Sequence, residues 1–391
     1  MDHILFDDQK WSDLLPLTYT RPSAELRIGI LTIREKWEKT LGVEFSHITK
    51  PHLSEKYDLT SSDDNLLING RLCPTSEFIQ KLGSLSMGEA LVTNGNLLAF
   101  RTDSKGLEDF NFETVSGTEL NIEGTLLSHP WDIFNKNGHE LELDFNLLTQ
   151  NRESQSLSST NTIIGNGRIF IEEGAKVEGT ILSTSNGSIY IGKYSEVMEG
   201  AVIRGPFALC NDSTVKMAAK IYGATTVGPH SKVGGEVNNS VIQGYSNKGH
   251  DGFLGNSVLG EWCNLGADTN NSNLKNNYSL IDCWNYTTAS YINTDLQFCG
   301  LIMGDHSKTG INTMFNTGTV VGVSCNIFGA GFPLKHVPSF SWGSAGRMGT
   351  YRPDRALDTA QKMMERRDVE LTKVETDLLT EVFRMTEQQR N

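Results

Sequence analysis

The segment IGKYSEVMEGAVIRGPFALCNDSTVKMAAKIYGATTVGPHSKV, residues 191–233, decides the fold of the second half of this chain. Every sixth residue in it is aliphatic. The positions are Ile191, Val197, Ile203, Leu209, Val215, Ile221, Val227 and Val233. If roughly 30 % of residues are aliphatic or Met, eight such matches in one frame arise by chance on the order of once in 10⁴. The stripe therefore indicates a regular structure with a six-residue period.

A six-residue period fits neither an α-helix nor an isolated strand, but it fits a parallel β-helix. In such a solenoid the aliphatic residue points inward, and a small residue turns the corner. Three hexapeptides close a coil of about 18 residues, so residues 163–330 predict roughly nine coils. The alternative is an antiparallel sandwich, whose strands have a period of two. Irregular strand spacing in a sandwich would not keep phase over residues 191–233.

The same frame returns further along the chain. Its later members are Phe253, Leu259 and Leu265, then Met303, Thr309, Phe315, Val321 and Ile327. Two segments, 238–250 and 268–298, interrupt it. In a solenoid, interruptions are expected to be loops that leave the coil at a corner, and such loops commonly carry function.

Composition and hydrophobic periodicity divide the chain into four regions. Residues 1–150 alternate apolar strands (4–6 and 66–68) with a helical pattern over 26–41, which predicts an α/β domain. Residues 151–162 form a Ser/Asn-rich linker. Residues 163–345 are the predicted β-helix, and 353–391 predict one or two amphipathic helices. We expect those helices to cap the open end of the solenoid rather than to pack on a neighbouring subunit, because an exposed terminal coil is an aggregation edge.

Composition limits the partners. The chain has 391 residues and a net charge of −13. Such a surface repels nucleic-acid backbones and anionic lipid, so neither is an expected partner, although local cations can still hold a small anion. None of the six cysteines has the spacing of a metal or redox motif, which predicts buried reduced thiols and no metal site. The sequence shows neither the pattern of a signal peptide nor an apolar run long enough to span a membrane, so the cytoplasm is the expected compartment.

A polar, glycine-rich stretch holds the first candidate for chemistry. His250 lies between two glycines in SNKGHDGFLG, residues 246–255. A histidine there is poorly placed as core filler, and an imidazole that titrates near neutral pH suits proton transfer. Arg204 and Lys220 are cations in an acidic chain and would suit a phosphate. The alternative for both is an ordinary solvated charge.

Residues 247–267, NKGHDGFLGNSVLGEWCNLGA, resemble the acetyltransferase domain of the bifunctional GlmU family. That family comprises glucosamine-1-phosphate N-acetyltransferases that are also N-acetylglucosamine-1-phosphate uridyltransferases. The shared pattern is a Gly-His pair, an aromatic-Leu-Gly three residues on, and Asn-aliphatic-Gly-Ala at the same distance. Gly205-Pro-Phe-Ala208 also matches. The openings LLPLTYTRP (14–22) and RIGILTIREKW (27–37) resemble the divergent GlmU-like proteins of Bacteroidetes.

The resemblance implies a left-handed β-helix that forms a homotrimer and binds acetyl-CoA between subunits. It places His250 on the general base and Ala267, with Gly266, on the backbone that faces the acetyl carbonyl of the cofactor. It places Asn264 and Asn273 on asparagines that contact substrate or cofactor, and Lys220 on a phosphate-binding arginine. Phe253 stands where the family has a substrate-contacting tyrosine, and Asn238 where it has a phosphate-binding lysine. These departures leave the acceptor sugar open.

The N-terminal region departs further from the family. The resemblance implies a nucleotidyltransferase fold, here reduced, yet no glycine cluster follows the first strand to hold nucleotide phosphates. Arg21, Arg27 and Asn69 are the candidate nucleotide-binding residues. The position of the family's metal-binding aspartate is Arg71, and Mg²⁺ needs oxygen ligands. We therefore expect weak, altered or absent sugar-nucleotide binding, with Mg²⁺ as a cofactor only if this domain is active.

Three functions follow from these features. The first is an acetyl-CoA-dependent N-acetyltransferase that acts on an amino-sugar phosphate such as glucosamine-1-phosphate. The second adds uridylyl transfer to N-acetylglucosamine-1-phosphate in the N-terminal domain. The third is a non-catalytic oligomeric scaffold that binds sugar nucleotide.

Overall fold

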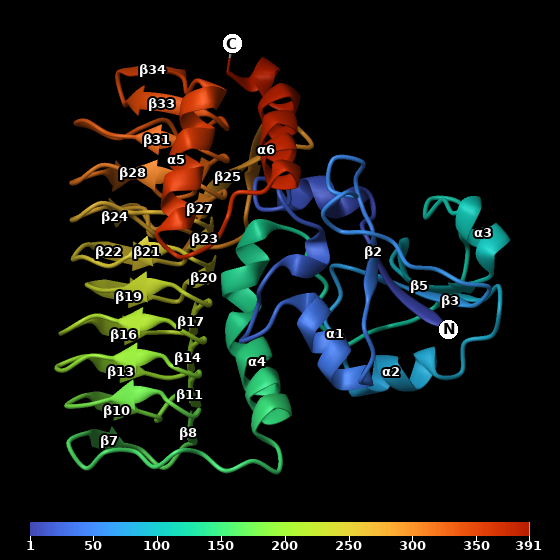
Figure 1. Cartoon of the computed structure of the whole chain (residues 1–391), viewed down its shortest axis with the longest axis horizontal. Helices are drawn as coiled ribbons and strands as arrows, with labels where there is room; N and C mark the ends of the chain where they lie inside the picture. The colour runs from blue at the N-terminus through green and yellow to red at the C-terminus, as the bar shows by residue number, and fades with distance from the viewer. Residues whose placement is uncertain (391) are drawn as a thin grey trace. The chain divides into compact units, whose positions relative to one another are not determined.

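The computed structural model describes residues 1–390 (Figure 1). Its contacts divide into two compact units. The first comprises residues 1–14, 20–26 and 31–128, and the second comprises residues 15–19 and 27–30 together with the described chain from residue 129 on. An N-terminal α/β unit, a long parallel β-solenoid and C-terminal helices make up the chain, which confirms the predicted fold class.

The first unit contains a six-stranded mixed sheet in the order β2-β1-β3-β5-β4-β6. The parallel strands β1 and β3 confirm the two predicted strands. The sheet's strands are β1 (Asp2–Phe6), β2 (Ser46–Ile48), β3 (Asn65–Asn69), β4 (Ala90–Thr93), β5 (Asn96–Thr102) and β6 (Thr118–Glu119). Its helical segments are η1 (Gln9–Leu14), η2 (Ser23–Glu25), α1 (Ile33–Leu41), α2 (Ser76–Leu82) and α3 (Ser104–Glu108).

The helix predicted over residues 26–41 is shorter than expected. It begins only at Ile33, because Thr32 caps it through a capping box with Glu35. Gly42 ends it in the left-handed conformation. The preceding residues 27–30 belong to the second unit. There the Arg27 backbone N–H donates to Gln243 Oε1 at 2.6 Å.

Three parallel sheets build the solenoid. The first sheet consists of β7 (Thr162–Ile164), β10 (Ile181–Ser183), β13 (Val202–Arg204), β16 (Lys220–Tyr222), β19 (Glu236–Asn238) and β22 (Phe253–Gly255). The nine-stranded second sheet consists of β8 (Ile169–Ile171), β11 (Ile189–Ile191), β14 (Phe207–Leu209), β17 (Thr225–Val227), β20 (Val241–Gly244), β23 (Val258–Glu261), β27 (Leu301–Met303), β30 (Thr319–Val321) and β32 (His336–Val337).

The third sheet begins with five strands and continues through single bridges. The five are β9 (Lys176–Val177), β12 (Glu196–Val197), β15 (Thr214–Val215), β18 (Lys232–Val233) and β21 (Asn247–Lys248). Bridges at Asn264 connect β21 to β28 (Lys308–Thr309). After it come β31 (Asn326–Ile327), β33 (Ser341–Ser344) and the antiparallel β34 (Arg347–Thr350). The short pair β24 (Asn270–Asn271) and β29 (Met314–Phe315) completes the later coils.

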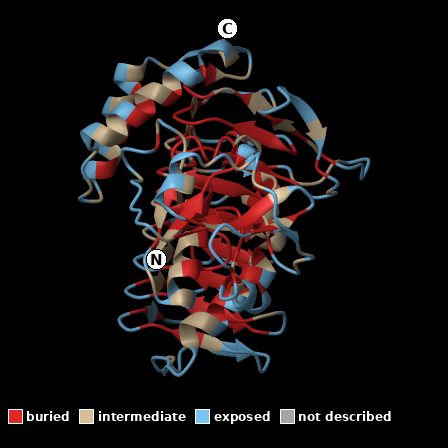
Figure 2. Ribbon diagram, turned by 90° about the vertical axis from the view of Figure 1, so that its right-hand side faces the viewer, coloured by how far each residue is buried: buried red, intermediate tan, exposed pale blue. Residues whose placement is uncertain are grey.

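The aliphatic stripe fills the solenoid interior, as predicted. All eight residues of the stripe from Ile191 to Val233 are at most 1 % exposed and lie in one core cluster. The register confirms the coil length: Ile191 pairs with Leu209 and Leu209 with Val227, each 18 residues apart. Figure 2 shows that buried residues recur in the ribbon from one coil of the solenoid to the next.

The two frame interruptions have different structures. The first, 238–250, is not an outward loop, because β20 and β21 keep their places in the walls and the coil is only shortened. Val227 pairs with Ile242, 15 residues on. The phase then shifts by one, so Leu254 is buried in the core and Phe253 faces outward, contrary to the frame predicted from sequence. The second interruption is the predicted loop, and it carries the hairpin of β25 (Asp282–Asn285) and β26 (Ser290–Asn293).

Residues before the first coil also pack on the solenoid. Helix α4 (Pro130–Thr149) lies along β17, β20 and β23 of the second sheet, within the second unit. The chain from residue 129 on therefore belongs to the unit that contains the solenoid, whereas the sequence places the domain boundary at 150. Residues 151–162, predicted as a linker, lie against the first coil, where Leu157 packs on the core.

The C-terminal segment forms α5 (Pro353–Glu365), α6 (Lys373–Met385) and η3 (Glu387–Gln389). These helices do not cap the end of the solenoid, where β34 is the outermost strand. Instead α5 lies along the third sheet, and Phe383 of α6 packs edge-on against Phe340 with ring centroids 5.2 Å apart. Figure 1 shows both helices beside the upper coils. Their buried faces lie on the solenoid side because amphipathic helices bury their apolar stripe.

All six cysteines are buried free thiols, as predicted. Across residues 1–390, none of the helices combines the length and the apolar character that a membrane crossing needs. In the same residues, no group of three or more His, Cys, Asp or Glu side chains is placed to hold a metal ion.

Candidate functional site

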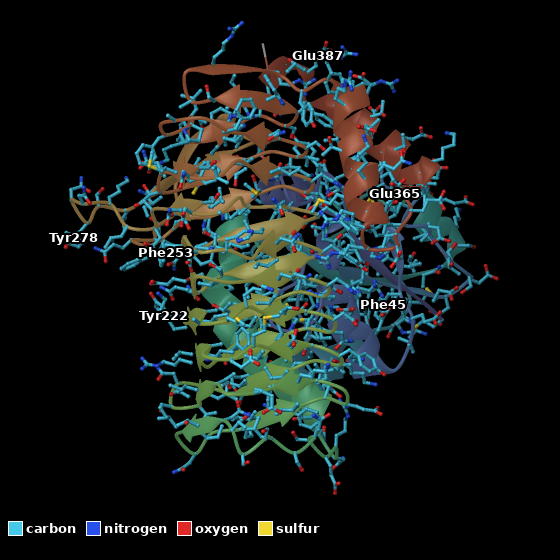
Figure 3. The ribbon with its side chains drawn as sticks, turned by 60° about the vertical axis from the view of Figure 1, so that its left-hand side comes forward. Phe45, Tyr222, Phe253, Tyr278, Glu365 and Glu387 are labelled. Atoms are coloured by element: carbon cyan, nitrogen blue, oxygen red, sulfur yellow. The ribbon has the colours of Figure 1, made fainter. Side chains whose placement is uncertain are left out.

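A cleft of about 1000 Å³ lies between the third sheet of the solenoid and helix α5. Four of the predicted site residues line it: His250, Asn264, Gly266 and Ala267. They come from consecutive coils, because coils related by the solenoid repeat place equivalent residues side by side. The other wall comes from Thr359, Lys362, Met363, Arg366 and Arg367. Figure 3 shows the end of α5, near Glu365, beside these strands.

His250 stands at a corner of the solenoid. It follows β21 of the third sheet and precedes β22 of the first sheet, and its side chain is exposed to the cleft. Its backbone carbonyl accepts a hydrogen bond from the ammonium of Lys248, which is 2 % exposed. Burial lowers the pKa of Lys248 to about 8, although the nearby carboxylates of Asp251 and Asp268 oppose this shift. The imidazole therefore projects from a backbone that a buried lysine holds in place.

Asp251 does not orient the imidazole in this structure. Its side chain is exposed, and no hydrogen bond joins it to His250 among the described residues. Its backbone carbonyl instead accepts from the Asp268 N–H at 3.0 Å. The sequence left this role open, and the geometry favours a turn residue.

The backbone N–H groups of Gly266 and Ala267 differ in their hydrogen bonding. The Gly266 N–H donates to the Thr309 carbonyl at 3.2 Å and to Thr309 Oγ1 at 3.0 Å. Within residues 1–390, no acceptor meets the Ala267 N–H. A free donor lining a cleft can hydrogen-bond an oxygen that gains negative charge. Ala267 thus has a backbone donor that is available in the cleft.

Asn264 is part of the wall of the cleft. Its backbone bridges β21 and β28, donating to the Ser307 carbonyl at 3.1 Å and accepting from the Thr309 N–H at 2.9 Å. Its side-chain oxygen accepts from Asn247 Nδ2 at 3.5 Å. The coil fixes the backbone of Asn264, so its amide side chain is presented to the cleft in a defined place.

Sequence reasoning missed the cations of the cleft. Lys216, Lys232 and Lys308 come from the solenoid, and Lys362, Arg366 and Arg367 from the end of the α5 region. Lys308 donates to the His306 carbonyl at 2.8 Å, and burial lowers the pKa of its ammonium to about 8. The only available signal was the run KMMERR over residues 362–367, which a sequence alone cannot place on a particular face.

The remaining predicted residues lie on the first sheet, around the corner from the cleft. Arg204 and Lys220 are exposed on β13 and β16. Phe253 projects outward from β22 on the side that also carries Tyr222, as Figure 3 shows. Asn273 donates to Asn256 Oδ1 at 2.8 Å. A Cβ added at Gly255 would lie 2.5 Å from the Phe253 ring and 2.8 Å from the Asn273 amide nitrogen. The side chains of Phe253 and Asn273 therefore pack directly against this glycine.

The first unit contains a cavity of about 530 Å³ at the carboxyl end of β1. Asp8 and Asn96 line it, but none of Arg21, Arg27 and Asn69 does. Asn69 is fully buried and donates to Asp8 Oδ2 at 2.8 Å. Asp8 also forms a buried ion pair with Arg71, from Nε to Oδ1 at 2.9 Å. At the position where the resemblance implies a metal-binding carboxylate, this chain has Arg71, whose guanidinium is already paired with the carboxylate of Asp8.

The two arginine candidates are both buried. Arg21 is 5 % exposed in the first unit. Arg27 is 7 % exposed in the second unit, where its Nε donates to the Gln243 carbonyl at 3.1 Å. The guanidinium of Arg27 therefore serves the packing of its loop on the solenoid, which corrects its expected nucleotide role.

The fold and the cleft define a class of protein: an α/β nucleotidyltransferase-like region followed by a hexapeptide-repeat solenoid. Residues 3–153 match the family model described as sugar nucleotidyl transferase. That match ends close to the boundary at 150 that the sequence predicts. The domain boundaries themselves stay a prediction, since packing groups residues 129–150 with the solenoid.

Curated proteins that match about half of this chain include bifunctional GlmU proteins. The protein from Methanocaldococcus jannaschii is 30 % identical over 213 residues, 54 % of this chain and 45 % of that protein. The protein from Methanococcus maripaludis is 26 % identical over 218 residues, 55 % of this chain and 46 % of that protein. The chain thus spans about half the length of the curated relatives that it matches. The resemblance to GlmU-like proteins is confirmed to this extent, and the grouping with Bacteroidetes stays a prediction.

Solved structures that align with the chain are distant. The polySia-specific acetyltransferase NeuO aligns with a TM-score of 0.28 and 16 % identity, over 49 % of this chain and 86 % of that one. The UDP-N-acetylglucosamine acyltransferase from Campylobacter jejuni gives 0.23 and 16 %, over 59 % and 82 %. TM-scores this low say nothing about function.

Proposed function

We propose that this protein is an acetyl-CoA-dependent N-acetyltransferase whose acceptor is an amino-sugar phosphate such as glucosamine-1-phosphate. One observation carries the proposal: the exposed imidazole of His250 and the unpaired N–H of Ala267 line the same cleft. A base and an oxyanion donor in one cleft are what acyl transfer to an amine requires. The GlmU relatives support the same activity.

The reaction follows from the chemistry of an amine. At neutral pH the amino group of the sugar carries a proton and cannot attack a thioester. His250 accepts that proton, and the amine nitrogen then forms a bond to the carbonyl carbon of the acetyl group. The Ala267 N–H hydrogen-bonds the oxygen that becomes negative. When the carbon–sulfur bond breaks, the imidazolium returns its proton to the departing sulfur and the new amide nitrogen releases its second proton to water, so no covalent enzyme intermediate is needed.

The acceptor is proposed to approach from the first sheet. His250 stands at the corner between the two faces, with the cleft on one side and Phe253, Asn273 and the exposed cations on the other. Lys220 and Arg204 are proposed to contact the sugar phosphate, and Asn264 and Gly266 to contact acetyl-CoA. We propose a cytoplasmic homotrimer in which a neighbouring copy closes the first-sheet side.

The test is an acetyl-transfer assay. The purified chain is incubated with acetyl-CoA and glucosamine-1-phosphate, and CoA thiol release is measured together with the mass of the sugar product. N-acetylglucosamine-1-phosphate, whose amine is blocked, is the control acceptor. We expect thiol release that depends on the free amine. Release equal to the blocked control, for glucosamine-1-phosphate and other amino-sugar phosphates alike, would leave a non-catalytic sugar-nucleotide scaffold as the better interpretation.

A second function, uridylyl transfer in the first unit, is favoured by the family-model match over residues 3–153. The cavity beside Asp8 lies at the carboxyl ends of strands, where open α/β sheets bind ligands. The Asp8–Arg71 ion pair works against it, because Asp8 then has less capacity to bind Mg²⁺. Pyrophosphate release from UTP and N-acetylglucosamine-1-phosphate, with and without Mg²⁺, decides this. No signal above the metal-free control would remove the second function.

A further inference from the structure

Four cations line one part of the cleft and outnumber the carboxylates near them. We call Lys216, Lys232, Arg366 and Arg367 the cation cluster. Lys216 and Lys232 come from neighbouring coils of the third sheet, and the two arginines directly follow α5. No ion pair involves any of the four within residues 1–390. The one carboxylate that lines the cleft, Asp212, faces His230 at 3.9 Å.

The four charges repel one another. Burial lowers the pKa of the Lys232 ammonium, and the charges of Arg367, Lys216 and Arg366 lower it further, against a smaller opposing effect of the Glu196 carboxylate. Burial and Arg366 likewise lower the pKa of Arg367. The carbonyl end of a helix favours cations, which accounts for arginines after α5, but it gives no reason for lysines on the facing strands. In a chain of net charge −13, such a concentration of like charge is a cost that an anionic ligand would relieve.

The structure also sets the cluster apart from the reacting end of the cleft. Arg367 donates to the His230 carbonyl and to Asn247 Oδ1, at the edge where the chain enters the third sheet. His250 is at the edge where the chain leaves it. Asn247, which Arg367 contacts, precedes His250 by three residues, which is roughly 10 Å of extended backbone at about 3.3 Å per residue. A ligand that contacts both the cation cluster and His250 must therefore have its phosphates separated from its acyl group by a comparable distance.

We propose that the cation cluster binds the phosphorylated nucleotide portion of the acyl carrier, with the ribose 3′-phosphate as a principal determinant of affinity. This inference rests on the proposed function for the identity of the carrier. It assigns α5 and the two arginines after it as one wall of the cofactor site, supplied by the same chain. The phosphate of the acceptor sugar is the other source of the same chemistry, and the experiment separates the two.

The experiment measures binding by calorimetry with the full-length protein. The probes are CoA, 3′-dephospho-CoA, adenosine 3′,5′-bisphosphate and glucosamine-1-phosphate. The double variant Lys232→Gln/Arg366→Gln is compared with the control Lys176→Gln/Lys193→Gln. All four side chains are exposed, and the control removes two cations of the solenoid that do not line the cleft. Thermal unfolding of each variant checks that the fold is intact.

We expect CoA to bind about tenfold or more tightly than 3′-dephospho-CoA, since a charge-assisted contact is lost with the phosphate. The cluster variant should lose that preference and bind adenosine 3′,5′-bisphosphate at least about tenfold more weakly, while the control keeps both. Equal affinities in variant and control overturn the inference. A cluster variant that loses only its affinity for glucosamine-1-phosphate also overturns the inference, because the cluster then binds the phosphate of the acceptor sugar. If the protein still transfers acetyl groups when either of these two results is found, the inference about the cluster fails but the proposed function does not.

Discussion

Replacing the buried Lys248 with methionine should make the solenoid more stable at neutral pH, and the gain should fade as the pH rises. Lys248 takes the rung position that pairs with Val233 of the interior stripe. Its pKa is lowered to about 8 from the ordinary 10.5, first by burial. The unfolded chain therefore binds more protons than the folded chain between pH 8 and 10.5, so stability rises with pH across that window.

The magnitude follows from the size of the shift. At pH 7 both states carry the proton, and a shift of this size corresponds to a penalty of about 3 kcal/mol. By pH 9.5 the folded lysine is mostly neutral, and the penalty falls to about 1.5 kcal/mol. The advantage of Lys248→Met over the wild type should therefore shrink by about 1.5 kcal/mol between these pH values, and at both pH values it is reduced by the lost hydrogen bond to the His250 carbonyl.

Urea unfolding at pH 7, 8.5 and 9.5, followed by tryptophan fluorescence, measures this difference. Subtracting the wild type cancels other groups that titrate, including Lys308. Lys176→Met, at an exposed site on β9, is the control and should show no such trend. A Lys248→Met difference that stays flat or grows with pH would refute the reasoning. The same variant should lower the rate of acetyl transfer, because the backbone under the imidazole loses its anchor.

Three further predictions concern the core, the first unit and the acceptor side. Ile203→Ala should cost about 2–5 kcal/mol in urea unfolding because Ile203 is fully buried, whereas Val202→Ala, at a neighbour 42 % exposed, should cost under about 1 kcal/mol; similar costs would contradict an inward stripe. Burial raises the pKa of Glu25, but hydrogen bonds from His47 and Arg34 outweigh it and hold the pKa at about 2. That stabilisation is present above about pH 4.5 and fades as the pH falls toward 2, so the wild type should lose about 2 kcal/mol between pH 5 and pH 3; an equal loss in Glu25→Gln would contradict this. Gly255→Ala would place a Cβ 2.5 Å from the Phe253 ring, so it should raise KM for the amino-sugar phosphate about tenfold and leave the affinity for CoA unchanged. Steady-state kinetics in which CoA affinity falls and this KM is unchanged would contradict an acceptor site on the first sheet.

The periodic part of the fold was predictable from sequence because one physical rule repeats along it. Each buried residue of the stripe from Ile191 to Val233 meets the same environment 18 residues later, so the pattern accumulates. The rule stops where a coil changes length. The shortened coil at β20 moves the interior position from Phe253 to Leu254, and a fixed frame cannot register a shift by one residue. It also cannot recognise Lys248, a cation in an interior position.

The site was predictable where a single coil defines it and unpredictable where separate segments meet. His250 and Ala267 converge because equivalent positions of consecutive coils are neighbours. The amphipathic pattern after residue 353 predicts helices with a buried face, but not the surface that covers that face. The cations at the end of α5 therefore had no assigned partner until the structure placed them over the third sheet. Arg27 was misjudged for the same reason, since nothing in its neighbourhood in sequence points to Gln243.

The most direct test of the account is the turnover number for CoA release from acetyl-CoA and glucosamine-1-phosphate in His250→Ala. His139→Ala, at an exposed histidine on α4, is the matched control. Loss of the general base should lower kcat by about 10²- to 10⁴-fold with little change in the affinity for CoA, and the control should retain full activity. Turnover by His250→Ala at the rate of the control would show that the imidazole in the cleft takes no part in the reaction.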